Sequence, residues 1–350
     1  MKMAGPGESD AIRPVARSLA SRLRMAMRRA IGAGSRADTE QVLHRLTQLE
    51  SLLVQTLHLN RKILKVLERQ RVALLDIVGE RGLQGETRQA NVALQAILRR
   101  LAVDPAALDY PHALRAQRFR VLSQNEEDGI LWALFQRVGV TNRRFVEIGC
   151  GVNGGNSGFL AQDCGWTGLM VDASPVRIAH IRERFGSDVV AVAAHVTRET
   201  IDDLLARHGL TGEIDLFSLD IDSCDYWVWE ALSVCSPRVV VVEYNAAFGF
   251  DRAVTVPHAP DFDRRLHGHR RYYGGSLRAF IQLGARKGYR LVVNEPRGVN
   301  AFFLRNDVGP GVPAWDPAPD PDRAADAAAL FEEFVQHGLP LVEVPAGTPR

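Results

Sequence analysis

The sequence lacks several features that would assign it at once to a class of protein. Its 350 residues include only four cysteines, and none stands in a CxxC pair, so neither a disulfide framework nor a zinc site is predicted. No apolar run approaches the roughly 18–20 residues that a membrane-spanning helix needs. The N-terminus also has no long apolar core of the kind that a secretory signal carries. We therefore expect a cytoplasmic protein with free thiols.

An excess of charge of one sign is also missing from most of the chain. The sequence has 43 basic and 41 acidic residues, so we expect no nucleic-acid partner. The local exception is residues 1–36, with eight basic residues against two acidic ones. The stretch ARSLASRLRMAMRRAIG fits either a solvated arm or an amphipathic helix on the inner face of an anionic membrane. We favour the solvated arm and keep peripheral membrane contact as the alternative.

Residues 39–78 contain neither proline nor glycine. Mostly apolar residues recur there at alternating steps of four and three, from Val42 to Ile77, which is the heptad spacing of a coiled coil. Asn60 falls at an a position if Leu46 is taken as a, and such an asparagine fixes register in parallel coiled coils. We predict a homo-oligomer formed through this helix; a helix packed against its own domain is the alternative.

Composition divides the whole chain into five regions. They are a basic arm (1–38), the coiled-coil helix (39–78), a helical connector (79–110), an α/β domain (111–308) and a C-terminal region (309–350). The last region combines a proline-rich linker, a short helix from about Arg323 to Gln336 and an irregular tail.

In the α/β domain, hydrophobic runs of strand length alternate with segments of helix length. The runs are FVEIG, GLMVDAS, VVAVAAHV, DLFSLDID, VVVVEYN, YRLVVNE and VNAFFLRN. This alternation predicts a doubly wound, mainly parallel, seven-stranded Rossmann-like sheet with helices on both faces. Only Pro296-Arg297-Gly298 separates the last two runs, which predicts a hairpin and one antiparallel strand near the C-terminal end of the domain.

A glycine-rich turn follows the first of these strands. Gly149, Gly151 and Gly154 satisfy the GxGxxG pattern, and the first two let the backbone turn sharply and a ligand approach closely. We expect the next helix to begin near Asn156. Asp172 ends the second strand, where it can accept hydrogen bonds from both ribose hydroxyls of an adenosine. These features fit a nicotinamide dinucleotide as well as S-adenosylmethionine.

Glu147, inside the first strand, favours S-adenosylmethionine. An acid close to the following helix N-terminus would repel the pyrophosphate of a dinucleotide. S-adenosylmethionine instead brings a sulfonium and an ammonium group, which an acidic strand end suits. The alternative is that Glu147 merely pairs with an arginine such as Arg144.

Motifs in a fixed order carry a resemblance to a known family. They are SQNEEDGIL, FVEIGCG, GWTGLMVDASP, LFSLDIDSCDYWVWEAL, PRVVVVEYN and GYRLVVNEPRGVNAFFLR. About half of the chain thus resembles the FkbM-type S-adenosylmethionine-dependent methyltransferases, which have the class I methyltransferase fold. The resemblance implies that Gln124, Asp172, Ala173, Ser174, Ala194 and His195 complete the cofactor site formed with Glu147, Gly149, Gly151 and Asp220. For His195 the alternative is a loop histidine that binds no ligand. The family's Asp-x-Glu-Gly motif is replaced here by Asp220-Ile-Asp222-Ser223.

Acidic and amide side chains follow the fourth and fifth strands. Because the carboxyl ends of parallel strands meet at one edge of a sheet, these side chains should lie close together. In one hypothesis, Asp222, Glu243 and Asn245 bind Mg²⁺, which would lower the pKa of an acceptor hydroxyl. In the other, Asp222 or His258 acts alone as a general base. We expect Asp225 to cap the helix that follows it.

Two groups near these strands have open interpretations. Tyr226, Trp227 and Trp229 are either core residues or a substrate platform. The arginines between residues 264 and 271 are either solvated surface, which we favour, or contacts for an anionic acceptor.

The sequence as a whole predicts methylation of a hydroxyl on a small-molecule or glycan acceptor. An NAD(P)-dependent oxidoreductase is one alternative, because GxGxxG also fits that class. The other is a non-catalytic coiled-coil scaffold with a degenerate methyltransferase domain, which the altered Asp220-Ile-Asp222-Ser223 motif leaves open.

Overall fold

A computed structural model describes residues 108–318 and 321–346 of the chain. The predicted basic arm and coiled coil, and most of the connector, lie outside the described residues. None of the described helices has both the length and the apolarity to cross a bilayer.

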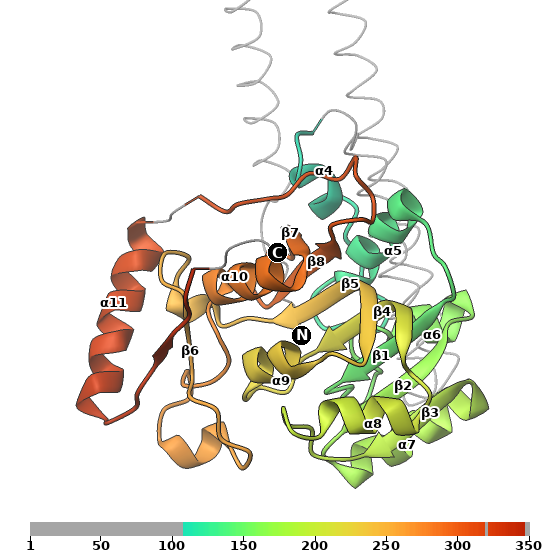
Figure 1. The fold of residues 1–350 in the computed structure, drawn as a ribbon, viewed down its shortest axis with the longest axis horizontal. Helices are drawn as coiled ribbons and strands as arrows, with labels where there is room; N and C mark the ends of the chain where they lie inside the picture. Colours follow the sequence, from blue (N-terminus) through green and yellow to red (C-terminus); the bar gives the residue numbers. More distant parts are fainter. Residues whose placement is uncertain (1–107, 319–320, 347–350) are drawn as a thin grey trace, which may run out of the picture. The chain divides into compact units, whose positions relative to one another are not determined.

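Seven strands form one sheet in the order β3-β2-β1-β4-β5-β8-β7 (Figure 1). They are β1 (Arg144–Ile148), β2 (Thr167–Asp172), β3 (Val189–Ala193), β4 (Gly212–Leu219), β5 (Cys235–Glu243), β7 (Tyr289–Asn294) and β8 (Asn300–Arg305). Each coincides with one of the seven predicted runs. The first five pair in parallel, whereas β8 runs antiparallel to both β5 and β7. The prediction of a mainly parallel sheet that ends in a hairpin is confirmed.

Helices cover both faces of the sheet. They are α4 (His112–Arg115), α5 (Glu127–Val138), α6 (Gly158–Cys164), α7 (Pro175–Phe185), α8 (Ile201–Arg207), α9 (Asp225–Ala231) and α10 (Leu277–Lys287), with the 3₁₀ turn η2 (Gly186–Asp188) after α7. Apolar residues of α8, α9 and α10 share one core cluster with Val146 and Ile148 of β1. Those of α4 to α7 share the other with Phe145. Because neighbouring strand residues point to opposite faces, near-continuous apolar strands supply both clusters.

The open question about the aromatic residues of α9 is decided by packing. Trp229 and Tyr226 are almost fully buried, and the Trp229 ring packs against Phe280 and Phe303. Trp227 is partly buried, and its indole nitrogen donates to the Val256 carbonyl at 2.8 Å. These side chains belong to the core, where burying each large aromatic stabilises the fold by about 1.5–3 kcal/mol.

A third cluster joins the C-terminal region to the segment that follows β5. That segment contains η3 (Ala246–Phe248), β6 (Val254–Thr255) and η4 (Arg264–His267); the C-terminal region contains α11 (Pro321–Gln336) and β9 (Val342–Glu343). Phe331 and Phe334 of α11 pack against Phe248, and β9 pairs antiparallel with β6. Figure 1 shows α11 beside β6, away from the main sheet. The predicted short helix is present, but the tail after it is not wholly irregular.

Candidate active site

The turn after β1 needs glycine at two positions, for different reasons. Gly149 has φ +88°, and a Cβ there would lie 1.6 Å from the backbone oxygen of Asp220 at the end of β4. Gly151 has φ +59°, and nothing lies within 4 Å of the position its Cβ would take. The first glycine therefore lets two strand ends approach closely, and the second leaves an open side at which a ligand can contact the backbone.

Glu147 is fully buried beneath this turn. One carboxylate oxygen accepts hydrogen bonds from the Asn156 amide and the Ser218 hydroxyl, and the other from the amide and hydroxyl of Ser157. Burial raises its pKa to about 8 despite these hydrogen bonds. A Cβ on Gly155 would lie 2.1 Å from the same carboxylate, so the loop closes tightly over it.

The alternative interpretation of Glu147, a simple ion pair with Arg144, is not what the structure shows: the Arg144 side chain donates to the Gly209 carbonyl. The helix expected near Asn156 begins two residues later, at Gly158. The backbone donors just before α6 are satisfied by a carboxylate from β1, which the local sequence around the helix could not indicate.

Asp172, at the end of β2, connects the glycine turn to the next helix. Its carboxylate accepts hydrogen bonds from the amides of Gly151 and Ser174 at 3.1 and 2.8 Å, and it pairs with the exposed Arg177 at 3.2 Å. The Ser174 hydroxyl caps α7 by accepting from the Arg177 amide, and the neighbouring Ala173 is exposed. The predicted adenosine-binding residues therefore lie together, next to Gly151.

The remaining predicted cofactor residues border this region less closely. The Ala194 amide donates to the Asp172 carbonyl at 3.1 Å, which places the end of β3 beside β2. His195 is exposed, and its Nε2 contacts the Pro260 carbonyl at 3.0 Å. Gln124 is exposed between two buried residues. Their contact with a cofactor stays a prediction.

Two buried acids in the SQNEEDGIL segment, for which we predicted no role, hold the backbone on either side of Gln124. Asp128 accepts hydrogen bonds from three consecutive backbone amides, Val121 to Ser123, at 2.6–3.0 Å. Burial raises its pKa to about 6, although these hydrogen bonds oppose the shift. Glu127 accepts from the Asn125 amide and from the Asn300 side chain on β8. Adjacent acids at the start of an apolar helix were the available signal.

The strand ends of β4 and β5 bring three carboxylates together. Oxygen atoms of Asp220, Asp222 and Glu243 all lie within 4.8 Å of one another. Glu243 is 8% exposed, and its Oε2 is buried without a hydrogen-bond partner among the described residues. Asp222 has φ +55°, a left-handed conformation that is uncommon outside glycine, so the loop holds this acid in a specific place.

Burial raises the pKa of all three acids, and repulsion between carboxylates adds to the shift at Asp220 and Glu243. Burial raises the pKa of Asp220 to about 7, and the nearby charge of Asp225 adds to the shift. Burial also raises the pKa of Glu243 well above its usual range, and the contact with the Asp220 carboxyl raises it further. Burial raises the pKa of Asp222 too, although the guanidinium of Arg264, which forms an ion pair with it, opposes this. Perturbed acids gathered at a strand edge are typical of functional sites.

Two neighbours of this cluster have structural roles. Asp225 does not cap α9 as predicted: its carboxylate accepts from the amides of Ile221 and Ser223 in the preceding turn. Asn245, a predicted metal ligand, uses its side chain to donate to the carbonyls of Arg271 and Tyr273 and to accept from the Ala247 amide. One lone pair on its Oδ1 is left for another contact.

His258, the alternative base, lies elsewhere in the loop after β6. Its Nε2 is 2.6 Å from a carboxylate oxygen of Glu199, and its ring lies 6.2 Å from that of Trp227. The described residues that line the cavity beside Glu243 do not include it. The structure thus groups Asp222 with Glu243 but does not bring His258 to the same wall.

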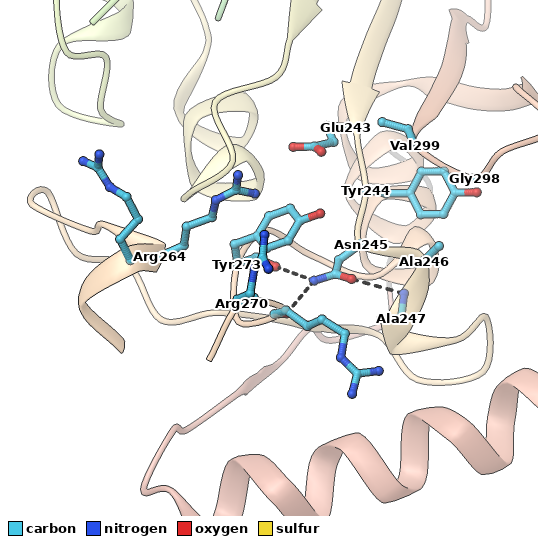
Figure 2. A pocket seen from close by; sticks show the side chains of 12 residues that line it. Glu243, Tyr244, Asn245, Ala246, Ala247, Arg264, Arg270, Tyr273, Gly298 and Val299 are labelled. Carbon is cyan, nitrogen blue, oxygen red and sulfur yellow. Dashed lines mark hydrogen bonds between the residues drawn. The ribbon is translucent and has the colours of Figure 1, made fainter. Parts of the chain in front are cut away.

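A cavity of about 480 Å³ opens beside the acid cluster (Figure 2). Its walls come from the end of β5, the loop between β6 and α10, and the β7–β8 hairpin, and they include Glu243, Tyr244, Asn245, Tyr273, Val299 and the four arginines 264, 265, 270 and 271. The arginines that we favoured as plain solvated surface therefore line a cavity. Tyr273 also lines it, whereas Tyr272 is buried in the third cluster.

Comparison with known proteins gives matches among solved structures alone: no family model and no curated protein matches the chain. The methyltransferase domain of bacterial CtHen1-C is 14% identical, over 51% of this chain and 97% of that one, with a TM-score of 0.33. An O-methyltransferase from Bacillus cereus in complex with SAH is 16% identical, over 66% and 94%, with a TM-score of 0.33. A geranyl diphosphate C-methyltransferase from Streptomyces coelicolor, with Mg²⁺ and S-adenosyl-L-homocysteine, is 13% identical, over 51% and 81%, with a TM-score of 0.34. These structural neighbours are methyltransferases; membership of the FkbM-type family stays a prediction.

Proposed function

We propose that this protein is an S-adenosylmethionine-dependent methyltransferase. One observation carries the proposal, the arrangement of the glycine turn after β1. The space beside Gly151 is open, the Gly151 amide donates to Asp172, and the buried Glu147 accepts hydrogen bonds from the end of the turn. Asp172 offers acceptors for ribose hydroxyls, and the open backbone at Gly151 admits a ligand. The motif resemblance to methyltransferases points to the same function.

The position of Glu147 argues against a dinucleotide cofactor. In dinucleotide sites the pyrophosphate binds the amide groups at the helix N-terminus. Here the amides of Asn156 and Ser157, just before α6, already donate to the Glu147 carboxylate. A pyrophosphate would have to displace this buried acid or lie against it, whereas S-adenosylmethionine carries no phosphate.

The reaction that suits this site is O-methylation. The acceptor oxygen attacks the methyl carbon, the carbon–sulfur bond breaks to leave S-adenosylhomocysteine, and the hydroxyl proton must go to a base. Glu243 lines the cavity and Asp222 lies next to it, and the raised pKa of each makes it a stronger base than an ordinary carboxylate. We propose a hydroxyl of a sugar or glycan as the acceptor, because four arginines, Glu243 and Asn245 among the lining residues carry side chains that can form hydrogen bonds.

A divalent cation such as Mg²⁺ would fit the same acids. Asp220, Asp222 and Glu243 present hard oxygen ligands, and the buried Oε2 of Glu243 accepts no hydrogen bond from the described part of the chain. When bound, such a cation lowers the pKa of a coordinated hydroxyl. Arg264 forms an ion pair with Asp222, so one positive charge from the chain already lies beside the three acids.

Calorimetric titration of the full chain tests the cofactor. We expect S-adenosylmethionine and S-adenosylhomocysteine to bind and NADH and NADPH not to bind. Asp172→Asn should weaken adenosyl binding about 10–100-fold, because hydrogen bonds to a charged acceptor contribute about 1.5–3 kcal/mol. The matched control is Asp203→Asn on α8, where the side chain is 78% exposed and forms an ion pair with Arg207.

The two alternative functions, an oxidoreductase and a non-catalytic scaffold, predict different results of this titration. Nicotinamide binding would establish the oxidoreductase and overturn our interpretation of Glu147. A folded protein that binds neither kind of ligand would favour the scaffold. The proposed homo-oligomer through residues 39–78 is tested separately, by the mass of the full chain in solution compared with that of a chain lacking this segment.

A further inference from the structure

The four arginines of the cavity differ in how far other groups of the protein neutralise them. Arg265 forms a bidentate ion pair with Asp263, two residues earlier on the same turn. Arg264 pairs with Asp222 through one nitrogen and lies 5.1 Å from the centre of the Tyr273 ring. Since a guanidinium has five N–H donors, Arg264 keeps donors for a further ligand.

The other two arginines carry most of the unmatched charge. Arg271 is exposed and forms a long ion pair with Glu333 on α11, at 3.7 Å, in which its guanidinium makes no hydrogen bond. Arg270 is exposed and has no ion-pair or hydrogen-bond partner in the part of the chain that the structure describes. The cavity therefore has an excess of positive charge on the wall formed by the loop between β6 and α10.

The opposite wall of the cavity has the reverse character. Glu243 is the one acid among the described residues that line the cavity. Figure 2 shows its carboxylate at the end of β5, facing the side that carries Arg264 and Tyr273. A molecule in the cavity would thus meet a proton acceptor at one end and guanidinium groups at the other.

We propose that the methyl acceptor is an anionic sugar, with a phosphate or carboxylate group held by Arg270 and Arg271 and a hydroxyl placed at Glu243. This inference rests on the proposed methyltransferase function, because it names the class of acceptor for that site. Guanidinium groups match phosphate and carboxylate oxygens in planar, two-pronged hydrogen bonds. A volume of about 480 Å³ lies within the range of small-molecule sites, about 300–1,000 Å³, and accommodates one sugar with its anionic group.

Direct binding tests the proposal without methyl transfer. The full chain, with no adenosyl ligand present, is titrated by calorimetry with glucose 6-phosphate, glucuronate and glucose. We expect at least one anionic sugar to bind at least about tenfold more tightly than glucose, and more weakly at high salt. A preference between glucose 6-phosphate and glucuronate identifies phosphate or carboxylate as the recognised group.

Variants locate the anion site. Arg270→Gln should weaken binding of the anionic sugar about tenfold and leave glucose unchanged, because one charge-assisted contact is lost. Arg270→Lys should lose less, since it keeps the charge but not the planar fork. Arg207→Gln on α8, where the side chain is 75% exposed and outside the cavity, is the matched control and should have no effect.

Several results would overturn the proposal. They are equal affinity for glucose and the anionic sugars, failure of both anionic sugars to bind, or an equal loss in Arg270→Gln and Arg207→Gln. Titration with S-adenosylhomocysteine separates this failure from that of the proposed function. If the adenosyl ligand binds but Arg270→Gln has no effect, the acceptor class alone is wrong. If the sugar binds through Arg270 and no adenosyl ligand binds, the methyltransferase function is wrong and the anion site stands.

Discussion

Replacing Glu243 by glutamine should make the protein more stable at alkaline pH when no divalent cation is present. The glutamine side chain has nearly the same shape as the glutamate but carries no charge. In the wild-type chain, Glu243 lies against Asp220, its Oε2 has no hydrogen-bond partner among the residues that the structure describes, and its pKa is raised well above its usual range. The substitution removes one of the charges that the folded state forces together.

The pH dependence follows from the direction of the shifts. A carboxyl whose pKa is raised on folding binds its proton more tightly in the folded chain, so stability is highest below the unfolded pKa and falls as pH rises through the folded one. For Asp220 the pKa rises from 3.8 to about 7, which amounts to at most about 4 kcal/mol lost between pH 4 and pH 8. Because its raised pKa favours the protonated form of Glu243 more strongly at lower pH, Glu243→Gln should increase the free energy of unfolding by about 1–3 kcal/mol at pH 8 and by less at pH 5.

Denaturant unfolding followed by tryptophan fluorescence measures this difference. All five tryptophans lie between residues 132 and 315, so the signal reports on the α/β domain and the start of the C-terminal region rather than on the first hundred residues. Both proteins are unfolded at pH 5 and pH 8, in EDTA and in MgCl₂. Mg²⁺ should stabilise the wild-type chain at pH 8 more than the variant, since a ligand that binds only the folded state raises its stability.

Asp215→Asn is the matched control, because we expect it to lower the stability at pH 8 rather than raise it. Asp215 is buried but accepts hydrogen bonds from the amides of residues 141–143 and from Arg238, and these hydrogen bonds hold its pKa below the usual range. Removing that charge should destabilise the domain by about 2 kcal/mol or more at pH 8. If Glu243→Gln lowers stability at pH 8 in EDTA, or has the same effect at pH 5, the carboxylates do not repel one another as we argue.

Three further predictions concern the cofactor turn and the modular organisation. Gly149→Ala should abolish adenosyl binding and lower the free energy of unfolding by several kcal/mol, because its Cβ would overlap the Asp220 backbone. The control, Gly165→Ala, has a positive φ but open space around the new Cβ, so denaturant unfolding should show a loss of only about 1–2 kcal/mol. Glu147→Gln should lower the free energy of unfolding by about 1–3 kcal/mol, because the new NH₂ group would face a backbone N–H that now donates a hydrogen bond to the carboxylate. The control is Glu183→Gln at an exposed position, and an equal change in both variants would refute this role of Glu147. Removal of residues 1–38 should leave calorimetric binding of S-adenosylhomocysteine intact, and loss of binding in a folded truncation would refute the modular organisation.

The sequence by itself determined the fold of the described domain. Seven apolar runs with helix-length spacers fix strands and crossovers, because parallel strands buried on both faces need continuous apolar stretches. The short Pro296-Arg297-Gly298 connection can join neighbouring strands only as an antiparallel hairpin, and β7 and β8 form one. The strand-end positions of Asp172, Asp222 and Glu243 followed from the same pattern, since parallel strands place their carboxyl ends at one edge.

The tertiary structure alone decided what those side chains contact. Glu147 satisfies the backbone just before α6, and Asp225 braces a turn rather than capping α9. Arg270 lines a cavity opposite Glu243, 27 positions away in the sequence. Periodicity reports which face of an element is buried, but a hydrogen-bond partner or a shared cavity depends on distances between segments far apart in the chain, and these are set only when the sheet, its helices and the loop after β5 pack together.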